Sequence, residues 1–392
     1  MKVVFISNFL NHHQLPFCES MNEKTQFHFI QTERVNEERL SMGYGEFEDK
    51  YPFLLCPYVS DIEAKKTQTI IDDADFVITG SAPESFIAHR LKENKPVIRY
   101  SEPFLRKQQW RYFLPKTIKF MYNRNTKYAK RNVYMLCNGC YTASDFSIYR
   151  SYIGKTYKWG YFPKTIKYDI EKLIKEKRKP TLEIIWVGRL LKLKHPLMIL
   201  NTAKSLKEDG YKFNVSIIGT GQCEDEMKAF VEENELTDNV HFLGNTSPDD
   251  VRKYMEKANI FMFNSDHREG WGAVVNEAMN SGCAVISSQG PGSTGYMIKH
   301  MENGLVYNYK RFRSLYKNVK LLFDDDLLRE KLGKNAYLTI TQTWNAKTAV
   351  RNLVVLLNCL AEGVPTSVLE GPCSIAPITP RRGMYRRMIK KR

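Results

Sequence analysis

The 392-residue sequence has no run of about 20 apolar residues, the length that a membrane-spanning helix needs. Its first residues, MKVVFISNF, become polar too early for a secretory signal peptide. Cys137 and Cys140 have CxxC spacing, but they lack the second CxxC or histidine pair that would complete a zinc site. The other cysteines are scattered, as is usual for reduced thiols in a cytosol. We therefore expect a cytoplasmic protein that could reach a membrane only peripherally.

Acidic residues are absent from a long segment, 103–144, in which Lys and Arg alternate with Trp, Tyr and Phe. The chain as a whole has a net charge of +16, which favours polyanionic partners. Three interpretations are open for the segment. It could dock on an anionic membrane, bind nucleic acid by stacking and charge, or form a helical subdomain with buried aromatics and solvated charges. We expect contact with an anionic membrane surface and do not expect nucleic acid.

Short apolar runs alternate with helix-like stretches along most of the chain, which predicts βαβ units and parallel sheets. One series lies at 2–7, 76–80 and 96–101, and a more regular one at 182–188, 213–219, 240–244, 260–265 and 283–288. The expected fold is therefore α/β with two Rossmann-like domains, at 1–165 and 181–344. We expect a linker at 166–180, a helix at 345–362 that crosses back to the first domain, and a basic, flexible tail at 363–392.

Glycines and cations follow two strands of the second series where each strand ends. Gly188 is followed by Arg189 and Lys194, and Gly219 and Gly221 follow the next strand. Arg can grip two phosphate oxygens at once and Lys is a point charge, so this pair could neutralise a diphosphate, or it could be a solvated basic turn. The glycines allow a tight turn at a phosphate or substrate, although the third glycine of a dinucleotide fingerprint is missing.

The segment 265–282, SDHREGWGAVVNEAMNSG, follows the strand at 260–265. Gly270 and Gly272 leave backbone amides open just before a predicted helix, whose start favours a diphosphate. Glu269 lies at this turn, and Glu277 lies about 12 Å further on if the span is helical at ~1.5 Å per residue. The two carboxylates could accept hydroxyls at two ends of one ligand. Alternatively, they are a helix N-terminal carboxylate and an exposed helical glutamate.

In this order and spacing, VGRL with its following lysines, GTG and EGWGAVVNEAMNSG resemble glycosyltransferase family 4, or group 1, of the GT-B fold. The resemblance covers 181–310 and extends to the first domain by architecture alone. It implies two domains that face across a cleft, sugar transfer with retention, and no essential divalent metal. It further implies that Glu269 contacts the donor sugar, that Glu277 contacts the ribose, and that Arg189 and Lys194 hold the diphosphate. The expected donor-binding set is Gly188, Gly219, Gly221, Asn264, Gly270, Trp271, Gly272 and Glu277.

The sequence departs from the family pattern in three places, which bear on donor contacts and acceptor specificity. Tyr296 stands where an acid is usual, Cys283 follows the small glycine where proline is usual, and 8–13 replaces a glycine pair after the first strand. His13 falls in this last segment, beside His12. It could steer the acceptor or assist proton removal, or it could belong to a plain surface loop.

The sequence thus predicts a retaining, metal-independent hexosyltransferase. It would move sugar from a UDP- or GDP-sugar to a hydroxyl of a carbohydrate or lipid-linked acceptor, in cell-surface polysaccharide or glycolipid assembly. No cofactor beyond this nucleotide diphosphate sugar is expected. Asp-x-Asp pairs at 72–75 and 324–326 are interpreted as solvated charges rather than metal ligands. The alternatives are a sugar-nucleotide epimerase of the same fold and a catalytically inactive GT-B scaffold that binds polyanions or membranes.

Overall fold

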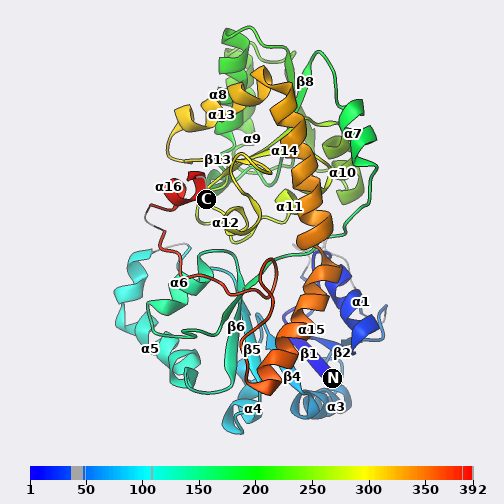
Figure 1. Cartoon of the computed structure of the whole chain (residues 1–392), viewed down its shortest axis with the longest axis vertical. Coiled ribbons are helices and arrows are strands. Elements are labelled where there is room, and N and C mark those ends of the chain that lie inside the picture. Colours follow the sequence, from blue (N-terminus) through cyan, green and yellow to red (C-terminus); the bar gives the residue numbers. More distant parts are fainter. Residues whose placement is uncertain (37–46, 49, 107–108, 382, 391–392) are drawn as a thin grey trace. The chain divides into compact units, whose positions relative to one another are not determined.

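The computed structural model describes residues 1–36, 47–48, 50–106, 109–381 and 383–390. Lys107, part of the basic and aromatic segment, lies outside these residues. The chain divides into two compact units, Met1–Lys164 with Asn345–Thr379, and Thr165–Trp344 with Pro380–Arg392. Each unit is built on a parallel sheet with helices between successive strands (Figure 1). The prediction of an α/β protein with two Rossmann-like domains is confirmed.

The first unit contains a parallel sheet in the order β3-β2-β1-β4-β5-β6-β7. The strands are β1 (Lys2–Ser7), β2 (Gln26–Gln31), β3 (Leu54–Leu55), β4 (Phe76–Thr79), β5 (Val97–Ser101), β6 (Val133–Asn138) and β7 (Thr156–Trp159). The strand order reverses between β1 and β4, which pair in register from Val3 opposite Phe76. Ligands of open α/β sheets bind outside the carboxyl ends of strands at such a switch point. Here those ends lead into the segment after Ser7 and into Gly80.

Helices and 3-10 turns connect these strands. They are α1 (Leu15–Lys24), α3 (Asp61–Asp73), η1 (Glu84–Ile87), α4 (Ala88–Lys92), η2 (Gln109–Phe113), α5 (Pro115–Arg124), η3 (Thr126–Tyr128) and α6 (Thr142–Ser147). The long helix α15 (Ala346–Glu362) belongs to this unit and packs against α1 (Figure 1). The Asn345 side chain accepts from the Thr348 amide to start α15, and Gly363, at φ +71°, ends it.

The sequence 363–392, predicted to be flexible, is partly built into the fold. The Cys373 amide donates to the Lys158 carbonyl (2.7 Å) and the Ala376 amide to the Thr156 carbonyl (3.0 Å), so this stretch pairs with β7. Cys373 is fully buried. An edge strand offers unpaired backbone groups, and these groups hold a segment whose composition alone suggests a loose tail. Further on, α16 (Met384–Ile389) packs near the edge of the second unit's sheet.

The second unit contains a parallel sheet in the order β10-β9-β8-β11-β12-β13. The strands are β8 (Leu182–Val187), β9 (Phe213–Ile218), β10 (Val240–Gly244), β11 (Ile260–Phe263), β12 (Ala284–Ser288) and β13 (Leu305–Tyr307). This order is that of the dinucleotide-binding Rossmann fold, with its switch point between β8 and β11. Ile184 and Ile185 of β8 pair with Ile260 and Phe261 of β11 at the sheet centre. The predicted glycine and glutamate motifs follow β8, β9 and β11, at the carboxyl edge.

The connecting helices of this unit cover the sheet and bury its apolar centre. They are η4 (Lys192–Lys194), α8 (Leu197–Glu208), α9 (Glu224–Glu233), α10 (Pro248–Lys257), α11 (Val274–Asn280), α12 (Thr294–Met297), α13 (Phe312–Asp324), α14 (Asp326–Leu338) and the π-helical turn η5 (Thr339–Thr343).

The predicted linker at 166–180 contains a helix of the second unit, α7 (Ile170–Glu176). Its Leu173 and Ile174 are buried. The following Lys177 is also buried, and its ammonium donates to the carbonyls of Met255 (3.1 Å), Ala258 (2.8 Å) and Ser281 (2.6 Å). The charge-rich sequence was interpreted as a linker, but its apolar side packs inside the unit and the Lys177 ammonium is hydrogen-bonded there.

Candidate active site

Two glycine turns interlock at the carboxyl ends of β8 and β9. Gly188, Gly219 and Gly221 adopt φ values of +153°, +124° and +153°. A Cβ at Gly219 would lie 2.1 Å from the Gly188 carbonyl oxygen, and one at Gly221 would lie 2.8 Å from that of Leu190. Both the backbone angles and the space therefore require glycine. The structure thus brings together two turns that the sequence analysis identified separately.

Lys194 and Glu269 form an ion pair beside these turns. The Lys194 Nζ and Glu269 Oε2 atoms are 2.7 Å apart, and the side chains are only 15% and 18% exposed. Ser265 Oγ also donates to Glu269 Oε2 (3.1 Å). Lys194 passes over the Gly188 backbone, which it can approach because glycine has no side chain. Arg189, by contrast, is exposed. Lys194, which is expected to hold the diphosphate, and Glu269, which is expected to contact the donor sugar, are therefore immediate neighbours.

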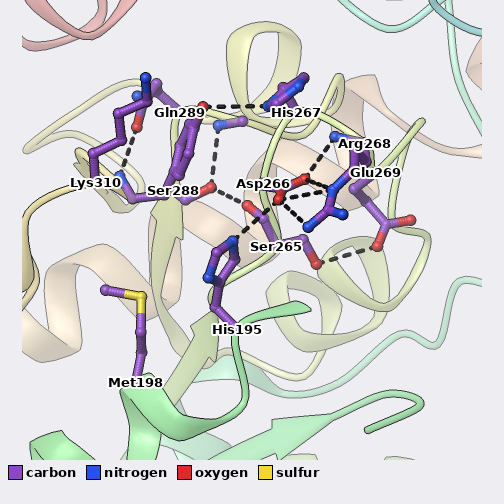
Figure 2. Close-up of polar contacts among 12 residues, drawn as sticks. His195, Met198, Ser265, Asp266, His267, Arg268, Glu269, Ser288, Gln289 and Lys310 are labelled. Carbon is purple, nitrogen blue, oxygen red and sulfur yellow. Dashed lines mark hydrogen bonds and ion pairs between the residues drawn. The ribbon is translucent and has the colours of Figure 1, made fainter. Parts of the chain in front are cut away.

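Asp266 holds the loop after β11 to the turn after β8 (Figure 2). Its carboxylate accepts hydrogen bonds from Arg268 Nη2 (2.7 Å) and pairs with His195 Nε2 (3.1 Å), while its amide donates to the Leu193 carbonyl (2.9 Å). Burial alone would raise the pKa of Asp266, but the hydrogen bonds from His195 and Arg268 outweigh it and hold that pKa well below its usual range. The loop that carries Glu269 is thus fixed by an ionised aspartate.

Further glycines let the loops after β11 and β12 pack closely. A Cβ at Gly272, whose φ is +85°, would lie 2.2 Å from the buried ring of Phe263, and one at Gly290 would lie 2.5 Å from the Asp266 backbone. The Gly292 amide donates to the Gly270 carbonyl (3.0 Å). Helix α11 starts only at Val274. The prediction of about 12 Å between the two glutamates assumed a fully helical span, so it does not apply.

Glu277 lies on α11 with its side chain 20% exposed. Arg252 holds it in place: one guanidinium nitrogen donates to the Glu277 carbonyl (2.9 Å), and the other lies 3.9 Å from Oε1. That second contact is an ion pair rather than a hydrogen bond, so the carboxylate keeps acceptor capacity. Burial raises the pKa of Glu277, and the charge of Arg252 offsets part of this effect. The carboxylate is positioned but not saturated.

Two residues of the expected donor-binding set have no side-chain atom at the surface. Trp271 is fully buried, donates from Nε1 to Asn276 Oδ1 (2.9 Å), and packs 5.6 Å from the ring of Trp344. Asn264 is also fully buried and accepts from the Tyr307 hydroxyl (3.0 Å). The prediction that these side chains contact a ligand is therefore corrected. Burying the large Trp271 ring is favourable because it removes apolar surface from water. Both side chains therefore pack in the protein interior and support the loop after β11.

Tyr296, where the family pattern has an acid, stacks on Trp344 with ring centroids 5.9 Å apart and planes 15° apart. It also lies 6.3 Å from the ring of Trp271. The replacement of the acid is thus part of an aromatic cluster beneath the loop.

His13 belongs to the first unit, in the segment after β1. Its amide donates to Asn11 Oδ1 (3.0 Å), its carbonyl accepts from the Phe162 amide (3.2 Å), and its ring lies 5.9 Å from that of Tyr161. Burial, reinforced by the neighbouring His12, lowers the pKa of His13 to about 3. The imidazole is therefore neutral near pH 7, which suits a hydrogen-bond partner better than a proton carrier.

The aspartates at 324–326 have structural partners. Asp324 accepts from the Tyr211 hydroxyl (2.6 Å), Asp325 Oδ1 accepts from the Leu328 amide at the start of α14, and Asp326 pairs with Arg329 (2.6 Å). Across the described part of the chain, no group of three or more His, Cys, Asp or Glu side chains is arranged to hold a metal ion.

His195, Asp266 and Arg268 were not predicted as site residues from the sequence. A signal existed, because Asp266 and Arg268 stand directly after a predicted strand and His195 directly follows Lys194. His195 also adopts φ +46°, an unusual angle for a residue with a side chain. That angle and the pairing across 71 positions become visible only in the folded structure.

Comparison with known proteins places this geometry in a class. The solved structure of Anabaena Alr3699/HepE in complex with UDP superposes with a TM-score of 0.67 at 14% identity, over 91% of this chain and 100% of that one. The fold is that of the GT-B glycosyltransferases. Residues 169–339 match the family model for glycosyl transferases group 1. Over residues 169–339 the chain thus resembles the group 1 glycosyltransferases, and its fold is GT-B, as the motifs predicted.

Two curated relatives align with parts of the chain. The N-acetylgalactosamine-N,N'-diacetylbacillosaminyl-diphospho-undecaprenol 4-alpha-N-acetylgalactosaminyltransferase of Campylobacter jejuni is 29% identical, over 44% of this chain and 46% of that protein. The capsular polysaccharide biosynthesis glycosyltransferase CapM of Staphylococcus aureus is 24% identical, over 44% and 45%. The chain therefore spans about half the length of the curated relatives it matches.

Proposed function

We propose that this protein transfers a sugar from a nucleotide diphosphate sugar, a UDP- or GDP-sugar, to an acceptor hydroxyl, with retention at the anomeric carbon and without a metal ion. The observation that carries the proposal is the Lys194–Glu269 ion pair over the interlocked glycine turns, at the switch point of a group 1 domain. The UDP complex of the structurally similar Anabaena protein supports the choice of donor class.

The arrangement assigns a part of the donor to each group. The diphosphate would lie against Lys194, Arg189 and the backbone of Gly270–Gly272, Glu269 would accept hydroxyls of the sugar, and Glu277 would accept those of the ribose. During transfer the bond from the anomeric carbon to the diphosphate oxygen breaks, a bond to the acceptor oxygen forms, and the proton of the acceptor hydroxyl passes to the leaving diphosphate. Negative charge collects on the diphosphate, where the fixed cations stabilise it without reorganising.

The acceptor would bind to the first unit, at the switch point between β1 and β4. His13 lies in this region and, as a neutral imidazole, could orient the attacking hydroxyl by accepting its hydrogen bond. The Campylobacter relative is named for a diphospho-undecaprenol acceptor and the Staphylococcus relative for capsular polysaccharide. These names support a carbohydrate or lipid-linked acceptor in cell-surface polysaccharide or glycolipid assembly, on the cytoplasmic side of a membrane.

Donor binding is expected to depend on pH through Glu277. Because its pKa is raised above 4.5, protonation begins at mildly acidic pH and removes acceptor capacity for the ribose. A panel of UDP-, GDP- and dTDP-sugars first identifies the donor that stabilises the protein most against heat. The thermal stabilisation by this donor should then be larger near pH 8 than near pH 5. Glu277→Gln should bind weakly and show little pH dependence. Glu232→Gln, an exposed glutamate on α9, is the control and should match the wild type. Equal pH dependence in the Glu277→Gln protein would contradict the ribose role.

An exposed apolar surface in the first unit supports contact with an anionic membrane. We define it by Trp110 and Phe113 of η2 and Ile118 and Tyr122 of α5, whose exposed fractions lie between 48% and 67%. Exposed cations accompany them, namely Arg111, Lys116 and Lys119. Aromatic side chains at the interface with Lys and Arg at lipid phosphates characterise peripheral membrane binding. Within the described residues, no helix combines the length and apolar character that a membrane crossing needs.

Removing two aromatic anchors should weaken membrane binding. In flotation with liposomes that contain anionic lipid, the double variant Trp110→Ser, Phe113→Ser should lose more than about tenfold in partitioning, because each large buried side chain contributes ~1.5–3 kcal/mol. Ile62→Ser changes a residue that is 77% exposed but lies on α3, outside the surface, and should float like the wild type. If the double variant floats unchanged, or the control falls equally, this surface is not the membrane contact.

A further inference from the structure

A cavity of about 580 Å³ in the first unit is lined by arginines. Its walls come from the carboxyl ends of β4 and β5, the segment that follows β5, helix α5 and Met135 of β6. Thr79 and Gly80 at the end of β4 place it beside the switch point where we propose that the acceptor binds. All of its described lining residues belong to the first unit, and none of them is a proposed donor residue.

Among the described residues that line the cavity, every cation is an arginine, although lysines are frequent in the neighbouring segment 103–144. The arginines are Arg99, Arg106, Arg111 and Arg124. Among the described lining residues, Glu102 is the single carboxylate. A guanidinium fork matches two oxygens of a phosphate, whereas an ammonium acts as a point charge. The choice of arginine therefore favours a phosphate-type ligand over a general attraction to anions.

Two of the arginines are held rigidly by one glutamate. Arg99, only 5% exposed, donates to both carboxylate oxygens of Glu84 (2.6 and 2.9 Å), and Arg124 Nε lies 3.1 Å from the same carboxylate. Burial would raise the pKa of Glu84, but the hydrogen bond and charge of Arg99 outweigh it and lower that pKa. Arg99 Nε is buried and has no hydrogen-bond partner among the described residues. One carboxylate thus offsets only part of the charge of two fixed guanidinium groups.

The other two arginines differ in whether a carboxylate pairs with the guanidinium group. Arg106 pairs with Glu102, which also accepts from the Tyr161 hydroxyl (3.2 Å). Arg111 is exposed, and no carboxylate in the described part of the chain forms an ion pair with it. The cavity therefore keeps positive charge in excess of its carboxylates, with Arg111 best placed to meet an incoming anion.

The lining also includes apolar side chains, namely Phe104, Leu105, Phe120, Met121 and Phe146. Phe120 and Phe104 stack with centroids 5.9 Å apart, and both remain partly exposed. Serine and threonine hydroxyls line the cavity together with the arginines. A cavity whose lining combines arginines with apolar side chains suits a phosphate group joined to a less polar body.

We propose that this cavity binds a phosphate or diphosphate group carried by the acceptor, so that the acceptor is a phosphorylated carbohydrate or a lipid-linked one. This inference rests on the proposed transferase function and names its acceptor class. The shared chemistry is a phosphate bound by Arg99, Arg111 and Arg124. The apolar side chains would contact the adjoining carbohydrate or lipid.

The test is hydrogen–deuterium exchange of the full chain with inorganic pyrophosphate and with farnesyl diphosphate. Each ligand should slow exchange in β5 and α5. Arg111→Glu should weaken this protection by roughly 10- to 100-fold in apparent Kd, the effect of losing a hydrogen-bonded charged group. Lys130→Glu makes the same charge change at an exposed lysine that does not line the cavity, and it should leave the Kd unchanged.

The two ligands distinguish the two sources of the phosphate. Tighter binding of farnesyl diphosphate by more than about tenfold indicates that the apolar side chains contact a lipid chain, whereas equal binding indicates a soluble phosphorylated carbohydrate. Absence of protection in β5 and α5 with both ligands, or an equal loss in Lys130→Glu, would overturn the proposal. Failure of the proposed donor function would give a different result: no nucleotide sugar would slow exchange in residues 264–280. The same exchange experiment measures this segment independently of β5 and α5.

Discussion

Replacing Lys194 with alanine is expected to lower kcat for sugar transfer by about 100- to 1000-fold, the usual cost of removing one fixed group that stabilises developing charge. Lys194 is the partly buried cation beside the proposed diphosphate position, so its loss leaves the leaving group less stabilised in the transition state. The change also removes the partner of Glu269, which then keeps a poorly exposed negative charge close to the diphosphate. The KM for the donor should rise less than kcat falls, because charge builds up mainly in the transition state.

Lys192→Ala is the matched control, since Lys192 lies two positions away in the same turn but is exposed. It should retain activity within a few-fold, as expected for a solvated surface charge. Steady-state kinetics with the donor identified from the nucleotide-sugar panel provide the comparison. If the two lysine variants lose the same activity, the geometry of the Lys194–Glu269 pair has no special role.

Gly219→Ala should destabilise the second unit and abolish donor binding. The new Cβ would lie 2.1 Å from the Gly188 carbonyl oxygen, and this backbone atom cannot move without shifting the turn that carries Arg189 and Lys194. Gly210→Ala is the control for backbone strain alone. Gly210 also has a positive φ (+78°), but a Cβ there would meet no other atom, so no steric overlap is added. A left-handed alanine costs about 1–2 kcal/mol, and overpacking adds a further ~1–3 kcal/mol at Gly219.

Urea unfolding should therefore give a clearly lower midpoint for Gly219→Ala than for Gly210→Ala. Nucleotide-sugar titration should show that Gly210→Ala still binds the donor. Equal midpoints, or normal donor binding by Gly219→Ala, would mean that the interlocked turns tolerate a side chain and do not shape the site.

The second unit was readable from the sequence because its strands are buried on both faces and appear as continuous apolar runs. Strands β8 to β12 lie within the apolar runs predicted at 182–188, 213–219, 240–244, 260–265 and 283–288. The first unit was harder to read. Strand β6 lies inside the segment 103–144, where the missing acids and the aromatics drew attention to surface chemistry. Strand β2, QFHFIQ, has polar residues at both ends and no clear boundary.

The sequence motifs identified Lys194, Glu269 and the glycine turns as candidate site residues. The Lys194–Glu269 ion pair and the interlocking of the turns are seen only in the structure. The Asp266 network was missed because its partners come from separate strand ends, and only the sheet order brings β8 beside β11. Trp271 was misassigned because a sequence does not show whether an aromatic ring in a glycine loop points toward solvent or toward the core.

The most direct measurement is the release of nucleoside diphosphate from UDP- and GDP-sugars by the purified chain, with and without Glu269→Gln. We expect the wild type to turn over one donor class. We expect Glu269→Gln to lower kcat by at least about 100-fold, because an amide neither neutralises Lys194 nor accepts through both atoms. If no nucleotide sugar is turned over or bound by the wild type, or if Glu269→Gln is as active as the wild type, the proposed glycosyl transfer at this site is wrong.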